Sequence, residues 1–357
     1  MTPEHSSRAT AMEGAGTYNR NSSWQSALVG TALDLLSASA RQAPLGDAGA
    51  PLVIADYGSS QGRNSLAPMS AAIHALRERV GAERPICVVH NDLLGNDFAS
   101  LFEVLETDPA SYLRDQPRVF PSAVGRSFYG PVLPPGSVTL GWCSNSVHWL
   151  SRVPAASPDA WSWKNSESPN VRAAFQRQSD EDWRSFLTHR AQELRPGGRL
   201  VATLIASSTE DGGWNDTDAK QFHAAIRDKL VQDGVIRADE AARMVMPITY
   251  RSRTELTGPF VQNGIFANLV IEHLDISLGP DPIWDEFQRT KDVELFGKRW
   301  STVLRVTLGP SLASALEAQR RPRFLDSFEA ECAKGFKATP APVRPWYAKM
   351  VLAKLDA

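Results

Sequence analysis

Two acids and two glycines stand where a nucleotide-type cofactor could bind. Asp56, Gly58 and Gly62 follow the apolar run of residues 52–55, and Asp92 follows the next apolar run. A strand that runs into a glycine turn is a common beginning of a cofactor site. A carboxylate after the second strand can accept hydrogen bonds from both hydroxyls of a ribose. These residues therefore predict a site for a cofactor that contains a ribose.

The spacing of the turn narrows the choice of cofactor. The turn reads D-x-G-x-x-x-G, whereas a dinucleotide turn reads G-x-G-x-x-G and has an acid about 20 residues later. Asp92 lies well beyond that distance, and no G-K-[ST] follows the turn, which excludes a P-loop. The wider spacing suits a cofactor without a pyrophosphate and favours S-adenosylmethionine over NAD. A plain turn between a strand and a helix can have the same sequence, so the turn alone leaves that alternative open.

The elements that would position these residues alternate along the first half of the chain. Strands are predicted at 52–56, 85–91, 137–143 and 198–206, and helices at about 22–40, 66–80 and 170–194. Strands that alternate with helices form a parallel sheet covered on both faces. Beyond this region, helices are predicted within 216–245 and 282–335, strand character at 263–276, and an edge strand at 346–356.

This pattern predicts an α/β sheet with helical material over one end. Residues 1–16 are small and polar and are expected to be mobile. The expected division is a cofactor-binding core of residues 17–206, 263–277 and 345–357, with a helical cap of residues 207–262 and 278–344.

The composition excludes several classes of protein. The 357 residues are 42% hydrophobic and carry a net charge of -2, so there is no basic field to attract nucleic acid or an anionic membrane. No apolar run approaches the roughly 20 residues of a membrane span, and the N-terminus lacks the apolar core of a signal peptide. Three scattered cysteines, Cys87, Cys143 and Cys332, indicate a reducing compartment. We expect a cytoplasmic protein without nucleic-acid or membrane partners.

Five motifs occur in a fixed order and carry a family resemblance. They are TYNRNSSWQ (17–25), ADYGSSQGRNS (55–65), VVHNDLLGNDFASLF (88–102), GRSFYGPVLPPGSV (125–138) and SNSVHWLSRVP (144–154). Their combination closely resembles the SABATH methyltransferases, which include plant enzymes that methylate salicylic, benzoic and jasmonic acids and the caffeine-pathway N-methyltransferases. The resemblance covers most of the chain from about Met12 onward. It implies S-adenosylmethionine as cofactor and a class I methyltransferase fold, which is Rossmann-like with seven mostly parallel strands and a helical cap. It also implies a homodimer, and we expect a microbial member.

The resemblance implies a role for individual cofactor residues. Asp92 would bind the ribose hydroxyls, Leu93 and Phe128 would enclose the adenine, and Tyr18 would cover the methionine part. Without the resemblance, core packing would be the preferred explanation of Leu93 and Phe128. The full set of implied cofactor contacts is Tyr18, Ser22, Asp56, Gly58, Ser59, Asn64, Asp92, Leu93, Ser127 and Phe128.

The resemblance places a carboxylic acid substrate against Tyr18, Gln25, Asn145, His148 and Trp149. The amide of Gln25 and the indole of Trp149 are uncharged hydrogen-bond donors. A carboxylic acid with a pKa of about 4 is already ionised at neutral pH, so the remaining task is to align it with the methyl group. We therefore expect no catalytic acid or base, with Gln25 and Trp149 as orienting groups. His148 is the rival, because a base would matter if the acceptor carried a proton.

Two departures from the plant pattern bear on the site. Asn145 replaces a tyrosine that plant members usually carry, which implies a roomier or more polar pocket. Arg243, Val245 and Met246 stand where some plant members have a proposed metal site, so we expect no bound metal.

The leading prediction is methyl transfer to the carboxylate of a small, aromatic or apolar acid, giving a methyl ester and S-adenosylhomocysteine. N-methylation of a small heterocycle and a non-catalytic cofactor-binding protein are the alternatives.

Overall fold

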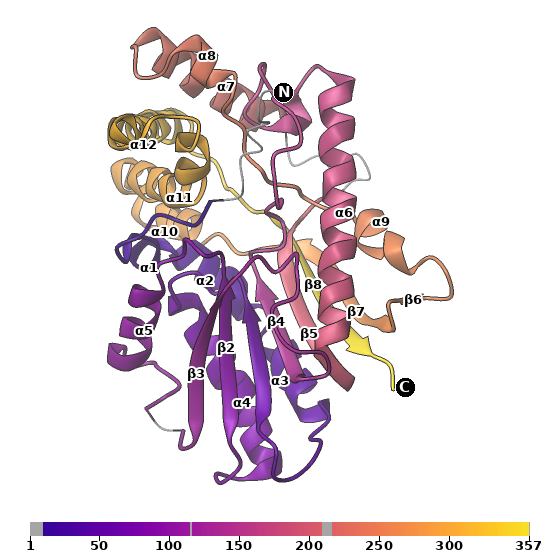
Figure 1. Cartoon of the computed structure of the whole chain (residues 1–357). Coiled ribbons are helices and arrows are strands. Elements are labelled where there is room, and N and C mark those ends of the chain that lie inside the picture. Colours follow the sequence, from indigo (N-terminus) through magenta and orange to yellow (C-terminus); the bar gives the residue numbers. More distant parts are fainter. Residues whose placement is uncertain (1–9, 115, 209–215, 357) are drawn as a thin grey trace.

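The computed structural model describes residues 10–114, 116–208 and 216–356, and its centre is one β-sheet (Figure 1). The strands in the described residues are β1 (Leu52–Tyr57), β2 (Ile86–Asp92), β3 (Val119–Gly125), β4 (Val138–Ser144), β5 (Leu194–Ala206), β6 (Ile265–Phe266), β7 (Leu269–Leu278) and β8 (Trp346–Lys354). Their order across the sheet is β3-β2-β1-β4-β5-β8-β7-β6. Strands β1 to β5 run parallel, whereas β8 is antiparallel to both of its neighbours. The carboxyl ends of β1, β2 and β4 therefore meet at one edge of the sheet.

Helices cover both faces of the parallel part of the sheet. One face packs against α3 (Leu33–Gln42), α4 (Leu66–Val80) and α5 (Phe98–Thr107), through side chains such as Leu36 and Ile73. The other face packs against α6 (Pro169–Glu193), which contributes Trp183, Phe186 and Leu187. Burial on both faces explains why the first six residues of β4, Val138 to Cys143, are all buried.

A further group of helices gathers at one end of the sheet, at the top of Figure 1. They are α7 (Asp216–Gln232), α8 (Ala238–Ala241), α10 (Pro282–Thr290), α11 (Val293–Ala313) and α12 (Arg321–Ala338). Helices α7, α11 and α12 share a core that contains Leu230, Leu312 and Phe328. The short helices are α1 (Thr17–Asn21), α2 (Ser23–Gly30), α9 (Arg253–Thr257) and the 3₁₀ turns η1 (Arg63–Ser65), η2 (Trp163–Asn165), η3 (Gly258–Phe260) and η4 (Ala318–Arg320).

The structure confirms the predicted α/β fold and corrects several details. The sheet has eight strands among the described residues instead of seven, because the two-residue strand β6 pairs with β7. Strand β8 was expected at an edge but lies between β5 and β7, where most of its residues are buried. The helix expected at about 22–40 is two helices, α2 and α3, interrupted after Gly30. Strand β3 was not predicted, since it carries Pro121 and leaves Phe120 exposed.

Of residues 1–16, expected to be mobile, residues 1–9 lie outside the described part of the chain, and several of residues 10–16 make the contacts described below. The division into a core and a cap stays a prediction. No helix in the described ranges is both long and apolar enough to cross a bilayer.

A buried ion pair fixes the segment after β3. Arg190 and Glu193 of α6 are fully buried and lie 2.7 Å apart. The guanidinium of Arg190 also donates to the carbonyls of Phe128 and Gly130, at 2.9 and 3.0 Å. The carboxylate of Glu193 accepts the hydroxyl of Tyr57 at 2.7 Å. This pair therefore joins α6, β1 and the loop that carries Phe128.

Removal of Arg190 should destabilise the fold strongly. In Arg190→Met the carboxylate of Glu193 stays buried without its cation, and the free energy of unfolding should fall by about 3–5 kcal/mol. Chemical denaturation measures this change. Arg184→Ala on the same helix is the matched control, because Arg184 is half-exposed in its pair with Asp180 and should cost less than about 1 kcal/mol. Equal losses in the two variants would contradict the assigned role of Arg190.

Candidate active site

A cavity of about 1650 Å³ opens at the carboxyl ends of β1, β2 and β4 and continues between the helices at that end of the sheet. Pockets for one drug-sized ligand measure about 300–1,000 Å³, so this cavity has room for a cofactor and a second molecule. The predicted site residues that line it are Tyr18, Gln25, Asp56, Gly58, Ser59, Asn64, Asp92, Leu93, Ser127, Phe128, Asn145, His148 and Trp149. Ser22 does not line the cavity; its hydroxyl lies 3.4 Å from Oδ1 of Asn64, which does.

The glycine turn after β1 is held on both sides. The backbone amides of Gly58 and Ser59 donate to the carbonyl of Asn91 at the end of β2, at 2.7 and 3.0 Å. The hydroxyl of Ser146, after β4, donates to the carbonyl of Gly58 at 3.1 Å. Gly58 has a φ of 85°, and a Cβ there would lie 2.1 Å from Oγ of Ser146. Only glycine fits at this position, which explains this part of the motif.

The carboxylate of Asp92 accepts hydrogen bonds from the glycine turn and from the next residue. Its Oδ2 accepts the amide of Ser60 and its Oδ1 accepts the amide of Leu93, both at 2.7 Å. The pKa of Asp92 is nevertheless raised to about 6, because burial opposes the charged form and Asp56 adds a second negative charge nearby. The cofactor end of the cavity thus has two carboxylates, which suit a ribose and a cation. This chemistry fits S-adenosylmethionine, which has both.

Apolar side chains stand beside these carboxylates. Leu93 is half-buried, and Phe128 lies edge-on to Tyr129 and Phe186, with ring centroids 4.8 and 5.7 Å apart. Both Leu93 and Phe128 line the cavity, and Phe128 also packs against the hydrophobic core. They can therefore offer apolar surface to a flat ring.

Three predicted substrate residues on the cavity wall carry uncharged hydrogen-bond donors. Gln25 is buried, and neither atom of its amide is hydrogen-bonded to the described part of the protein. The indole N–H of Trp149 likewise has no hydrogen bond there. Asn145 has a left-handed backbone with a φ of 53° and donates to Oγ of Ser144 at 3.2 Å. Two donors on the cavity wall are therefore available to a ligand.

Buried residues that sequence reasoning missed hold the segment of Trp149. Arg251, which is 1% exposed, donates to the carbonyl of Val147 at 2.7 Å and to that of Ser179 at 2.9 Å. The hydroxyl of Tyr129 donates to the carbonyl of Trp149 at 2.5 Å. An arginine in an otherwise ordinary stretch gave no signal of this role.

The far wall of the cavity is mainly aromatic and was also missed. It comes from α2, α7, α11, α12 and the segment before α9, and its residues include Trp24, Phe222, His223, Tyr250, Trp300 and Phe336. Lys164 of η2 lines the cavity too, with its Nζ 3.0 Å from the carbonyl of Tyr250. The chain has ten tryptophans, but this content alone does not single out these positions.

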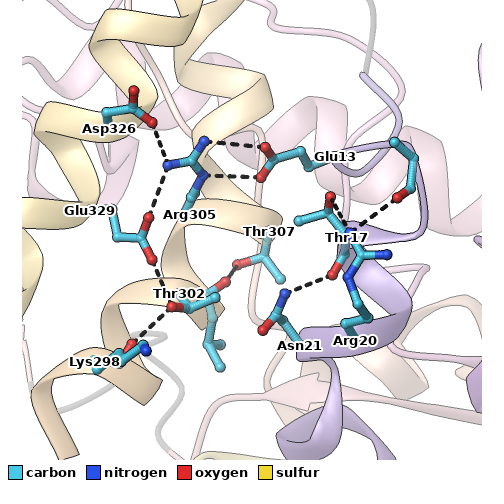
Figure 2. A network of polar contacts seen from close by, with 12 residues as sticks. Glu13, Thr17, Arg20, Asn21, Lys298, Thr302, Arg305, Thr307, Asp326 and Glu329 are labelled. Carbon is cyan, nitrogen blue, oxygen red and sulfur yellow. Dashed lines mark hydrogen bonds and ion pairs between the residues drawn. The ribbon is translucent and has the colours of Figure 1, made fainter. Parts of the chain in front are cut away.

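The N-terminal segment contributes to the cavity wall. Thr10 and Met12 line the cavity, and the hydroxyl of Thr10 lies 2.9 Å from that of Ser311 in α11. Figure 2 shows Arg305 of α11 between Glu13 and the two carboxylates of α12, Asp326 and Glu329. On the opposite side, Nε2 of Gln61, beside the glycine turn, donates to the carbonyl of Glu13 at 2.6 Å. The segment thus links the glycine turn to α11 and leads directly into α1 and α2.

Possible metal ligands do not converge in the described residues. No group of three or more histidine, cysteine or acidic side chains is placed there to hold an ion. Val245 and Met246, at positions compared with the plant metal site, are buried apolar side chains.

The fold and the site together define a class I S-adenosylmethionine-dependent methyltransferase. A solved structure titled "Loganic acid methyltransferase with SAH" has the same fold, with a TM-score of 0.77 and 22% identity over 96% of this chain and 98% of that one. A family model described as "SAM dependent carboxyl methyltransferase" matches residues 6–353, and the chain belongs to this family. The SABATH resemblance, the enzyme class and the cofactor predicted from the sequence are therefore confirmed.

Curated relatives include methyltransferases named for carboxylic acids and one named for a methylxanthine. The chain is 30% identical to salicylate carboxymethyltransferase from Clarkia breweri, over 78% of this chain and 75% of the relative. It is 27% identical to probable jasmonic acid carboxyl methyltransferase 1 from Theobroma cacao, over 84% and 85%. It is 28% identical to monomethylxanthine methyltransferase 2 from Coffea arabica, over 85% of each. These relatives are plant proteins, so they lend no support to the microbial source that we expected.

His148 should remain uncharged throughout the neutral range. Its pKa is lowered to about 3, mainly because burial opposes the charged form and also because Arg251 adds positive charge. The Cε1–H resonance of His148, assigned by comparison with His148→Gln, should therefore not shift between roughly pH 5 and 8. A titration with a midpoint near 6.5 would show that the imidazole gains a proton in this range.

Proposed function

We propose that this enzyme transfers a methyl group from S-adenosylmethionine to the carboxylate of a small aromatic or otherwise apolar acid. The observation that carries the proposal is the pair of uncharged donors, Gln25 and Trp149, which line the cavity without hydrogen-bonding partners in the described protein. Because both side chains line the cavity and their N–H groups have no partner among the described residues, this wall suits a ligand that brings oxygen acceptors. The aromatic far wall suits an apolar body behind the carboxylate.

The roles of the cofactor residues are proposed from the family resemblance, and all of these residues except Ser22 line the cavity. Asp92 would accept the ribose hydroxyls, and Leu93 and Phe128 would enclose the adenine. Asp56, the turn of Gly58 and Ser59, and Asn64 would hold the methionine part, covered by Tyr18. Ser22 would act through Asn64, and Ser127 would contact the cofactor beside Phe128. When bound, S-adenosylmethionine supplies an electrophilic methyl group on a positively charged sulfur.

The protein's part in the reaction is positioning. Gln25 and Trp149 would donate hydrogen bonds that hold the substrate carboxylate in one orientation, with Asn145 and His148 lining the same pocket. An acid with a pKa of about 4 needs no base at neutral pH, and His148 is a poor base because its pKa is lowered to about 3. Alignment of this kind can contribute on the order of 7–11 kcal/mol to a reaction barrier.

The sequence-based predictions about assembly belong to the same proposal. We propose a homodimer in the cytoplasm, with residues 207–262 and 278–344 as a cap over the substrate. The three cysteines are free thiols, as a reducing compartment would leave them.

Loss of either donor should impair use of the acid and spare the cofactor. Gln25→Leu and Trp149→Phe each remove one donor to a charged oxygen, and kcat/KM for the acid should fall about tenfold or more. Affinity for S-adenosylhomocysteine should stay within about twofold. The substrate comes from a screen of benzoates, indole acids, fatty acids and dicarboxylates, with labelled S-adenosylmethionine and detection of methyl esters.

The controls for this experiment are local. Ser23→Ala, at an exposed position on the same helix as Gln25, should leave kcat/KM unchanged. Wild-type activity in both donor variants would refute the proposed carboxylate site. Turnover of a nitrogen heterocycle with none of any acid would favour the N-methyltransferase alternative.

Cofactor binding should weaken as the pH falls through about 6. The ribose hydroxyls donate to the ionised carboxylate of Asp92, and protonation of this group, whose pKa is raised to about 6, removes an acceptor. At one unit below the pKa only about a tenth of the carboxylate is ionised, so Kd for S-adenosylhomocysteine should rise about tenfold from pH 7 to 5. Calorimetric titration measures Kd. In Asp92→Asn binding should be weak and flat over this range, and an unaltered pH dependence in that variant would assign the effect to another group.

A further inference from the structure

A buried histidine lies next to Asp56, one of the two aspartates proposed to bind the cofactor. His90 of β2 is 0% exposed and does not line the cavity. It is the cross-strand partner of Asp56 in β1. Nδ1 of His90 lies 2.9 Å from Oδ2 of Asp56, and Nε2 lies 2.8 Å from the hydroxyl of Tyr112. Both ring nitrogens are therefore engaged, one of them with a residue that faces the cavity.

The two oxygens of Asp56 have different surroundings. Oδ2 accepts the hydroxyl of Ser65 at 2.5 Å in addition to its bond with His90. Oδ1 makes no hydrogen bond to the described residues, although Asp56 is 2% exposed and lines the cavity. One oxygen is thus held by the protein, and the other is left for a ligand.

The hydrogen bonds define the proton positions. Tyr112 is 2% exposed, and burial raises the pKa of its hydroxyl above the usual value, so it keeps its proton. That hydroxyl has no acceptor in the described residues other than Nε2 of His90. Nε2 must therefore accept, and Nδ1–H must donate to Asp56. A protonated imidazole would leave the buried hydroxyl of Tyr112 without an acceptor, which is unfavourable.

We propose that His90 is a positioning residue for the cofactor. As an uncharged imidazole it orients the carboxylate of Asp56 through Nδ1–H and leaves its full negative charge for the ammonium of the methionine part of S-adenosylmethionine. A protonated histidine at this position would neutralise much of that charge. This inference rests on the proposed placement of the cofactor beside Asp56.

Two polar variants of His90 distinguish its hydrogen bond with Asp56 from its hydrogen bond with Tyr112. The amide nitrogen of His90→Asn occupies the place of Nδ1 and can donate to Asp56, whereas the longer side chain of His90→Gln replaces Nε2 and reaches toward Tyr112. In His90→Gln, Kd for S-adenosylhomocysteine and KM for S-adenosylmethionine should rise about tenfold, with kcat within about twofold, because a hydrogen bond to a charged group is lost. In His90→Asn both constants should stay within about threefold of wild type.

A stability control and a site control complete the experiment. Leu105→Ala removes a buried side chain from the core that also contains Tyr112; it should lower Tm and leave Kd unchanged. Equal Kd values in His90→Gln and His90→Asn, or a rise in Kd that follows the loss of Tm across all three variants, would overturn the role of His90. Asp56→Asn tests the site itself. Wild-type binding in that variant would refute the cofactor placement, whereas weak binding in Asp56→Asn with wild-type binding in His90→Gln would overturn the positioning role alone.

Discussion

The hydrogen bonds that join the ends of β1, β2 and β4 are the constraint on which the site depends. The amides of Gly58 and Ser59 donate to the carbonyl of Asn91, and Ser146 donates to the carbonyl of Gly58. The side-chain amide of Asn91 in turn donates to the carbonyls of Val124 and Arg126, at 2.9 and 2.7 Å. Four consecutive strand ends are therefore fastened together. Asp56, Asp92 and Phe128, which are far apart in the sequence, consequently share one cavity.

The residues proposed for the cofactor and those proposed for the substrate differ in charge. The cofactor residues include the carboxylates of Asp56 and Asp92, which suit a positively charged ligand. The substrate residues include uncharged donors and a histidine whose pKa is lowered by burial and by Arg251. An anionic acid and a cationic cofactor can therefore occupy neighbouring parts of one cavity, each against a wall of suitable polarity.

The helices at the end of the sheet do more than cover the cavity. Helix α2 carries Gln25, and its Trp24 and Leu28 pack against Trp300 of α11 and Tyr347 of β8. The segment before α1 is fastened to α11 through Arg305 and to the glycine turn through Gln61. Gln25 is thereby placed by contacts with two regions of the protein that are remote in sequence. A small displacement of α11 would move this donor relative to Asp56 and Asp92.

The amino-acid sequence alone determined the fold class, the cofactor and the positions of the motifs. These features are local: alternating strands and helices predict a parallel sheet, and a glycine turn can be recognised from a few neighbouring residues. The resemblance to the SABATH family assigned the site residues, and those that follow β1, β2 and β4 lie together because neighbouring parallel strands end at the same edge of a sheet.

The tertiary structure decided the rest. The interior position of β8, the support of Trp149 by Arg251, and the aromatic wall of Trp24, Tyr250 and Trp300 depend on contacts between distant segments. The partnership of His90 with Asp56 depends on the register of β1 against β2. Packing and strand register are properties of the whole chain, since each is set by the shape and polarity of side chains that are not neighbours in the sequence.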